Sequence, residues 1–228
     1  MENPQPDLSL TAEIKLYYDI YIPENAHGKL PLLFSIHGYG ANKRYMMREA
    51  RQIADEKFII ASLQAPNQHF RRSGDSYKLG FGWLTDYKAE ESVALHHKFI
   101  LDVIEKLQND NLIDENQIYL YGFSQACALN FRFAFTNPEV VRGVVGLCGG
   151  IPSDLETNEI YKPLNADVLY LYGDTDEFYS NEKFQNYDER LRAKSANYES
   201  KQYHAKHEIT DEIRNDVRNW LKEKSGKS

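Results

Sequence analysis

Cysteine is nearly absent from this chain of 228 residues, which contains only Cys127 and Cys148. Two cysteines do not make a disulfide framework, and we expect both to be small buried core residues, as free cysteines usually are. Long apolar runs are also lacking: no stretch of 18 or more apolar residues occurs, so we expect no membrane insertion. Long basic runs are missing too, and the formal net charge is −7, which argues against nucleic acid and anionic membrane surfaces as partners.

No hydrophobic leader opens the sequence, because the first residues, Met1 to Asp7, are polar and include prolines. We therefore expect a cytoplasmic protein. Hydrophobic residues make up 42% of the chain, enough for a sizeable core, and no internal repeat or low-complexity segment marks a boundary. We expect one domain over residues 1–228, with residues 1–10 as a loosely ordered lead-in.

The most informative stretch is residues 118–126, where a short apolar strand runs into Gly122-Phe123-Ser124-Gln125-Ala126 and a helix-forming segment follows at once. This strand–turn–helix context is typical of a nucleophile elbow, in which a sharp turn exposes the serine. The residues two before and two after the serine must be small, and they are Gly122 and Ala126. The alternative interpretation is that Ser124 only caps the helix that begins at Gln125.

An acidic and a basic partner follow in the order serine, aspartate, histidine that α/β-hydrolases use. The apolar strand 168–172 ends in Gly173-Asp174-Thr175-Asp176, and the strand 198–203 is followed by His204-Ala205-Lys206-His207. A serine hydroxyl is a poor nucleophile unless a histidine takes its proton and a carboxylate orients that histidine.

The residues alone leave two choices open. Asp174 competes with Asp176, and one of the two is expected to be a turn or cap residue. His207 is favoured over His204 because it lies in the loop before the last helix, whereas the strand pattern still continues at His204.

A further cluster lies upstream, where the buried strand Leu30 to Ile36 ends in His37-Gly38-Tyr39-Gly40. Flexible backbone at the end of a central strand can aim N–H groups at a developing oxyanion. We expect the donors to be the N–H groups of Tyr39 and Gln125, with Gly38 and Gly40 bordering the substrate and His37 shaping the turn. All these clusters fall at the carboxyl ends of predicted strands, where open α/β sheets bind ligands.

The remaining elements follow from apolar periodicity. One or two antiparallel edge strands are expected in Ala12–Ile22, a strand in Phe58–Leu63, and helices over 43–56, Glu90–Leu107, Gln125–Phe135, 180–194 and the segment from Ile209 to Leu221 with Thr210 as its cap. His96 and His97 lie on the second of these helices, but no second pair of ligands accompanies them, so we predict no metal site.

Gln64 to Tyr87 is the one long stretch without clear periodicity, and we interpret it as a functional loop that lines the substrate cleft. Trp83 and Phe81 are candidates to pack against an acyl or aromatic group. Arg71 or Arg72 is a candidate to meet a carboxylate or phosphate of the substrate. The alternatives are that Trp83 anchors the loop to the body and that the two arginines are a solvated pair.

Gly-Phe-Ser-Gln-Ala-Cys-Ala-Leu resembles the elbow of the phospholipase/carboxylesterase group, which includes the acyl-protein thioesterases and usually has Gly-Phe-Ser-Gln-Gly-Gly-Ala. The resemblance extends to His37-Gly38-Tyr39-Gly40, Ala65-Pro66, Trp83, Pro138, residues 143–152 and Gly173-Asp174-Thr175-Asp176. It implies an α/β-hydrolase fold: a mostly parallel central sheet with helices on both faces and little or no cap. It also implies a triad of Ser124, Asp176 and His207.

The expected function is that of a serine hydrolase, which cleaves esters or thioesters through an acyl-enzyme and needs no cofactor or metal. The absence of a long apolar lid and the 16 tyrosines favour short-chain or small aromatic esters as small-molecule substrates. The alternatives are an acyl-protein thioesterase or lysophospholipase, a phenolic-acid esterase, a short peptidase, and a non-catalytic α/β-hydrolase that serves as a binding module. Nothing in the sequence decides between a monomer and a homodimer.

Overall fold

A seven-stranded, mostly parallel sheet forms the centre of the protein in the computed structural model, which describes residues 7–24 and 26–226. The strand order is β1-β3-β2-β6-β7-β8-β9, and only β1 runs antiparallel to its neighbour. The strands are β1 (Tyr18–Tyr21), β2 (Leu30–Ile36), β3 (Ile59–Leu63), β6 (Ile113–Phe123), β7 (Gly143–Leu147), β8 (Leu164–Gly173) and β9 (Ser195–Tyr203). The predicted parallel sheet is therefore confirmed.

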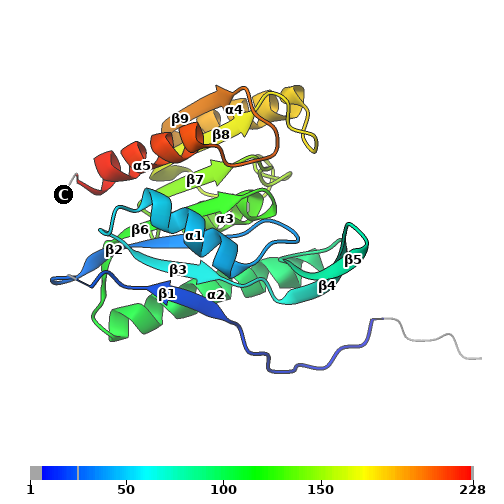
Figure 1. Cartoon of the computed structure of the whole chain (residues 1–228), viewed down its shortest axis with the longest axis horizontal. Coiled ribbons are helices and arrows are strands. Elements are labelled where there is room, and N and C mark those ends of the chain that lie inside the picture. Colours follow the sequence, from blue (N-terminus) through cyan, green and yellow to red (C-terminus); the bar gives the residue numbers. More distant parts are fainter. Residues whose placement is uncertain (1–6, 25, 227–228) are drawn as a thin grey trace, which may run out of the picture.

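Helices cover both faces of this sheet, as predicted. Figure 1 shows two of them, α1 (Lys43–Ile53) and α5 (Asp211–Ser225), on one face. The opposite face carries α2 (Ala89–Asn109), α3 (Gln125–Thr136) and α4 (Asn181–Lys194). Within the described ranges, no large cap covers the sheet. No helix of the described residues is long and apolar enough to cross a membrane.

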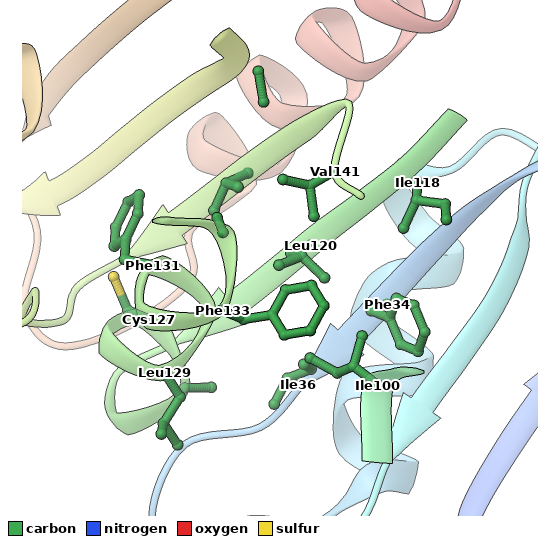
Figure 2. Packing of buried hydrophobic residues seen from close by; sticks show 14 of the residues in the cluster. Phe34, Ile36, Ile100, Ile118, Leu120, Cys127, Leu129, Phe131, Phe133 and Val141 are labelled. Atoms are coloured by element: carbon green, nitrogen blue, oxygen red, sulfur yellow. The ribbon is translucent and has the colours of Figure 1, made fainter. Parts of the chain in front are cut away.

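The inner strands of the sheet are rich in apolar residues because they are buried on both sides, whereas the edge strands β1 and β9 are partly exposed. Along β2, Leu32 and Phe34 join the core under α2 and α3, whereas the intervening Leu33 joins the core under α1 and α5. Figure 2 shows the first of these cores, where Phe133 of α3 packs among Leu120, Ile100 and their neighbours. The sheet is therefore packed against helices on both faces, and the carboxyl ends of its strands lie together along one edge of it.

The helix ends follow the sequence signals. Thr210 accepts a hydrogen bond from the N–H of Ile213 at 3.2 Å and so caps α5, as predicted. Asn42 caps α1 in the same way through the N–H of Tyr45. α3 ends just before Asn137-Pro138, where the proline disfavours the helical conformation of the residue before it.

One sequence prediction needs correction. The stretch 64–87 contains a β-hairpin, β4 (Asn67–Ser73) and β5 (Ser76–Gly82), which forms a separate two-stranded sheet. Its side chains are mostly exposed, so no apolar periodicity marks it. The one or two antiparallel edge strands expected in Ala12–Ile22 correspond to one strand, β1, which begins at Tyr18 and lies at the edge of the sheet.

The expected lead-in, residues 1–10, is described only in part. Its first six residues lie outside the described ranges, and residues 7–10 carry no regular secondary structure.

Candidate active site

Ser124 lies on a sharp turn between the end of β6 and the start of α3. Its φ of +57° and ψ of −118° place it in a region that residues other than glycine rarely adopt and that costs about 1–3 kcal/mol. The Ser124 side chain makes no capping hydrogen bond to α3, although Ser124 occupies the cap position. The hydroxyl instead lies 2.9 Å from Nε2 of His207. The geometry therefore disagrees with the alternative interpretation that Ser124 is only a helix cap.

The turn closes because the residues on either side of Ser124 are small, as the sequence predicted. A Cβ atom added to Gly122 would lie 2.5 Å from Nδ2 of Asn130 and 3.0 Å from the carbonyl oxygen of Ala126. Asn130 is fully buried and cannot move aside freely. The strand and the helix thus approach as closely as their backbones allow.

Gly122→Ala is expected to lower the free energy of unfolding by about 1–3 kcal/mol, because the added methyl group overpacks this contact. Urea denaturation followed by circular dichroism measures the change. Gly150→Ala is the matched control, since a Cβ atom there would meet nothing nearer than 3.8 Å, and it should change stability by less than about 0.5 kcal/mol. Equal unfolding midpoints for the two variants would contradict the prediction.

Asp176 lies against the Nδ1 side of the His207 ring. Its Oδ2 lies 2.7 Å from Nδ1 of His207, and its Oδ1 accepts hydrogen bonds from the N–H groups of Phe178 and Tyr179. The Asp176 side chain is completely buried, and that of His207 is 12% exposed. These contacts fit the tautomer in which Nδ1 donates to Asp176 and Nε2 accepts a hydrogen bond from the serine.

The competing residues form a separate pair on the surface. His204 Nδ1 lies 3.1 Å from Oδ2 of Asp174, and the His204 side chain is 88% exposed. Neither residue lines the cavity at Ser124. The structure therefore brings Asp176 and His207 to Ser124, and it leaves Asp174 and His204 apart from it.

The loop after β2 lies opposite the elbow. Gly38 faces Ser124 closely, and Gly40 has a φ of +78°, a conformation that glycine adopts readily. Between them, Tyr39 extends into solvent with 60% of its surface exposed. Gln125 is the first residue of α3, where backbone N–H groups have no partner within the helix. The N–H groups expected to face an oxyanion thus belong to a loop and a helix start on either side of Ser124.

His37 shapes this loop, as predicted. It is fully buried, its Nε2 accepts a hydrogen bond from the N–H of Ala65, and its Nδ1 lies 2.7 Å from the carbonyl oxygen of Gly38. Burial lowers the pKa of His37 to about 4, so the ring stays neutral at physiological pH.

A clamp of two side chains ties the elbow and the loop to the segment after β5. The Gln125 side chain accepts a hydrogen bond from the N–H of Trp83 at 2.8 Å and donates one to the carbonyl oxygen of Leu84 at 3.0 Å. Trp83 in turn donates from its indole nitrogen to the carbonyl oxygen of His37 at 2.8 Å. One buried tryptophan therefore binds Gln125 directly and binds His37, two residues before Tyr39, in the loop after β2.

The hairpin β4–β5 packs on the other side of the loop. The N–H of Gly40 donates to the carbonyl oxygen of Phe81 at 2.8 Å, and the ring of His69 stacks on Tyr39 with centroids 4.3 Å apart. Arg71 of the same hairpin packs against Gly40. A Cβ atom added to Gly40 would lie 3.4 Å from Cδ of Arg71. The hairpin thus braces the loop that faces Ser124.

These elements enclose a cavity of about 970 Å³, a size suited to a small organic ligand. Ser124 and His207 line it together with residues from the loop, α1, the hairpin, α3 and the segment after Asp176. The lining residues are Gly38, Tyr39, Gly40, Ala41, Asn42, Tyr45, Met46, Arg48, Arg71, Leu84, Phe123, Ser124, Gln125, Ala128, Phe178, Tyr179 and His207.

Three of the expected substrate-binding residues, Gly38, Gly40 and Arg71, line this cavity, whereas Trp83 and Phe81 do not. Trp83 is only 1% exposed because it is the buried anchor of the clamp, which was the alternative interpretation. Phe81 packs against the core instead of facing the cavity. The expectation that these two aromatic residues touch the substrate is corrected accordingly.

Sequence reasoning missed the contribution of α1 and of the segment after Asp176. Tyr45 and Arg48 are three residues apart on α1 and so share one face of it. Phe178 and Tyr179 follow Asp176 directly, and their backbone hydrogen bonds to its carboxylate turn the chain across the cavity. Their closeness in sequence to expected site residues was the signal that could have identified both groups.

Cys127 and Cys148 are fully buried, as expected. Burial raises the pKa of both thiols, that of Cys148 to about 12. Neither residue lines the cavity.

Comparisons with known proteins show the family and the fold. A sequence model of the family described as phospholipase/carboxylesterase matches residues 19–225. A carboxylesterase from Bacillus cereus is 17% identical with a TM-score of 0.70, over 92% of this chain and 94% of that one. A phospholipase/carboxylesterase from Dyadobacter fermentans is 17% identical with a TM-score of 0.71, over 92% and 98%. Acyl-protein thioesterase 2 from Zea mays is 15% identical with a TM-score of 0.68, over 92% and 99%. At these identities the structural likeness shows a common fold, that of the α/β-hydrolases.

Proposed function

The chain belongs to the phospholipase/carboxylesterase family of hydrolases, which act on esters, and on that premise we propose that it cleaves its substrates with a Ser124–His207–Asp176 triad. The observation that carries the proposal is the continuous hydrogen-bonded chain from Ser124 through His207 to the buried carboxylate of Asp176, at 2.9 and 2.7 Å. A nucleophile within hydrogen-bond reach of a base, with that base oriented by a carboxylate, is the arrangement that activates a serine.

In the first step the Ser124 oxygen attacks the ester carbonyl carbon while Nε2 of His207 takes the hydroxyl proton. The imidazolium that forms is stabilised by the Asp176 carboxylate at Nδ1. The carbonyl oxygen becomes an oxyanion, which accepts hydrogen bonds from the N–H groups of Tyr39 and Gln125. The clamp through Trp83 keeps these two groups in position, so little reorganisation is needed as the charge develops.

In the second step the carbon–oxygen or carbon–sulfur bond of the substrate breaks, and the alcohol or thiol leaves with the proton from His207. A water molecule then gives a proton to His207 and attacks the acyl-enzyme. The resulting tetrahedral intermediate collapses, releases the carboxylic acid and returns the proton to Ser124.

The walls of the cavity support small aromatic or short-chain esters as the preferred substrates. Tyr39, Tyr45, Phe178 and Tyr179 contribute four aromatic side chains to the lining of the cavity. Such rings offer apolar faces together with polar hydroxyl tips, which suits compact esters better than long acyl chains. The same machinery acts on thioesters, and acyl-protein thioesterase activity is therefore the second candidate function.

A fluorophosphonate probe tests the proposal directly, because it reacts only with an activated serine. Wild-type protein should take up one probe molecule per chain, on the peptide that contains Ser124, and lose activity on 4-nitrophenyl esters in parallel. Ser124→Ala should take up none. Intact-mass and peptide mass spectrometry give the stoichiometry and the position. A wild-type protein that resists the probe and hydrolyses no ester would leave only a non-catalytic binding role.

A further inference from the structure

The cavity at Ser124 has a charge opposite to that of the whole chain. The formal net charge of the chain is −7, with 34 acidic residues. Among the described residues that line the cavity, however, none is an aspartate or glutamate, and the only formal charges are those of Arg48 and Arg71. A concave site lined by one sign of charge concentrates its field on a ligand of the opposite sign.

Among the described residues, neither of these arginines is paired with a carboxylate, a property that they share with Arg44 and Arg72, which do not line the cavity. Seven other arginines form ion pairs with carboxylates: Arg51, Arg132, Arg142, Arg190, Arg192, Arg214 and Arg218. Within the described part of the chain, no carboxylate lies at ion-pair distance from Arg48 or Arg71. Glu49, the acid next to Arg48 in sequence, is bound by Arg214 through two hydrogen bonds of 2.7 and 3.2 Å.

Arg71 lies next to the reaction centre. Its side chain packs against Gly40, the residue after the expected oxyanion donor Tyr39. The N–H of Gly40 donates a hydrogen bond to the carbonyl oxygen of Phe81 on β5. Because β5 pairs with β4, this hydrogen bond also holds Arg71, which lies on β4, near the loop.

Arg48 approaches the cavity from α1, and its guanidinium lies 5.8 Å from the ring centre of Tyr45, another lining residue. The two guanidinium groups therefore come from two rigid elements that meet at the loop after β2. Guanidinium groups bind carboxylates in a bidentate manner, and a tyrosine beside one of them adds a hydroxyl donor.

From this charge distribution we infer that the substrates carry a carboxylate at a distance from the ester carbonyl, and that Arg48 and Arg71 bind it. The inference rests on the proposed function, since it concerns the same cavity. It adds a substrate class, esters that carry a carboxylate, which an esterase specific for neutral esters would not prefer. The carboxylate lies either on the acyl part or on the leaving alcohol.

Two matched pairs of substrates test both positions. For the acyl side, mono-4-nitrophenyl adipate is compared with its methyl ester, which has nearly the same shape and no charge. Adipate is chosen because the carboxylate of a shorter diacid attacks its own ester. For the alcohol side, 4-acetoxyphenylacetate is compared with its methyl ester. In at least one pair, kcat/KM of the wild type should favour the acid by about 5- to 30-fold at low salt, the range expected for one or two exposed ion pairs. The preference should shrink as ionic strength rises.

The variants assign the preference to residues. In Arg48→Gln/Arg71→Gln the ratio of the two kcat/KM values should fall to about 1, and Arg71→Lys should retain part of it. Arg72→Gln is the matched control: Arg72 is the next residue on β4, points to the opposite side and does not line the cavity, so the wild-type ratio should persist. A general disturbance of the loop by these substitutions would slow both members of a pair equally and leave their ratio unchanged.

Two results would overturn the inference: a wild-type ratio near 1 in both pairs, or a preference for the acid that survives in the double variant. Neither affects the proposed function, because hydrolysis of the neutral esters and labelling of Ser124 report on that separately. If the proposed function itself fails, no member of either pair is hydrolysed and Ser124 is not labelled.

Discussion

His207→Ala is expected to lower kcat/KM for ester hydrolysis by about 10³- to 10⁶-fold, whereas His204→Ala should leave it within about twofold of the wild type. Both histidines follow β9, and each lies beside an aspartate. Only His207, however, is within hydrogen-bond reach of the Ser124 hydroxyl, at 2.9 Å. In His207→Ala no imidazole is in position to accept the proton of Ser124. The His204 side chain is almost fully exposed and pairs with Asp174, so its removal leaves this proton transfer intact.

Steady-state hydrolysis of 4-nitrophenyl acetate by the purified variants measures this difference. Circular dichroism and the thermal unfolding midpoint verify that both variants fold. A larger loss in His204→Ala than in His207→Ala would refute the proposed assignment of the base. Equal small losses would show that neither histidine acts on Ser124.

Asp176→Asn should lower kcat by about 10⁴-fold with little effect on folding. Oδ1 of the asparagine can still accept the hydrogen bonds from Phe178 and Tyr179 that Asp176 accepts. The amide nitrogen, however, is a donor, so it stabilises the tautomer of His207 with an unprotonated Nδ1 and a proton on Nε2. A histidine in that tautomer cannot accept the proton of Ser124.

Asp174→Asn is the matched control, two residues away at the end of the same strand. Its activity should stay within about twofold of the wild type because the Asp174 side chain pairs with the exposed His204 and does not line the cavity. Both variants are assayed for kcat and for labelling by the fluorophosphonate probe, whose rate should fall in Asp176→Asn alone. Full activity in Asp176→Asn would mean that another group orients His207.

The sequence predicted the inner strands of the sheet because they are short apolar runs, such as Leu30–Ile36 and Ile59–Leu63. It predicted the position of the elbow because the constraint there is local: Gly122 and Ala126 must both be small for the turn to close. It did not decide between His204 and His207 by spacing alone. That choice depends on how the chain leaves β9, and on a hydrogen bond between residues far apart in sequence.

The hairpin β4–β5 was missed because a two-stranded ribbon with both faces largely exposed lacks alternation of polar and apolar residues. Its one available signal was Gly74-Asp75, which connects the paired residues Ser73 and Ser76. A glycine with an acidic neighbour in a two-residue connection is typical of a hairpin turn, and Gly74 has a φ of +60°.

The role of Trp83 could not be predicted for a different reason. Its partners, the carbonyl oxygen of His37 and the side chain of Gln125, are 46 and 42 residues away in sequence. An aromatic residue in a segment without periodicity fits substrate contact and internal anchoring equally well. Only the folded arrangement of β2, α3 and the hairpin distinguishes the two.

Because β4 and β5 pair only with each other, the hairpin can change in length and composition without disturbing the hydrogen bonds of the main sheet. Surface connections of this kind tolerate insertion and divergence far better than buried strands do. Changes at the tip of the hairpin can therefore alter the rim of the cavity while the main sheet stays as it is. The contacts of the hairpin with the loop after β2 and the clamp through Gln125 and Trp83 limit this freedom, because they connect the hairpin to the segments on either side of Ser124.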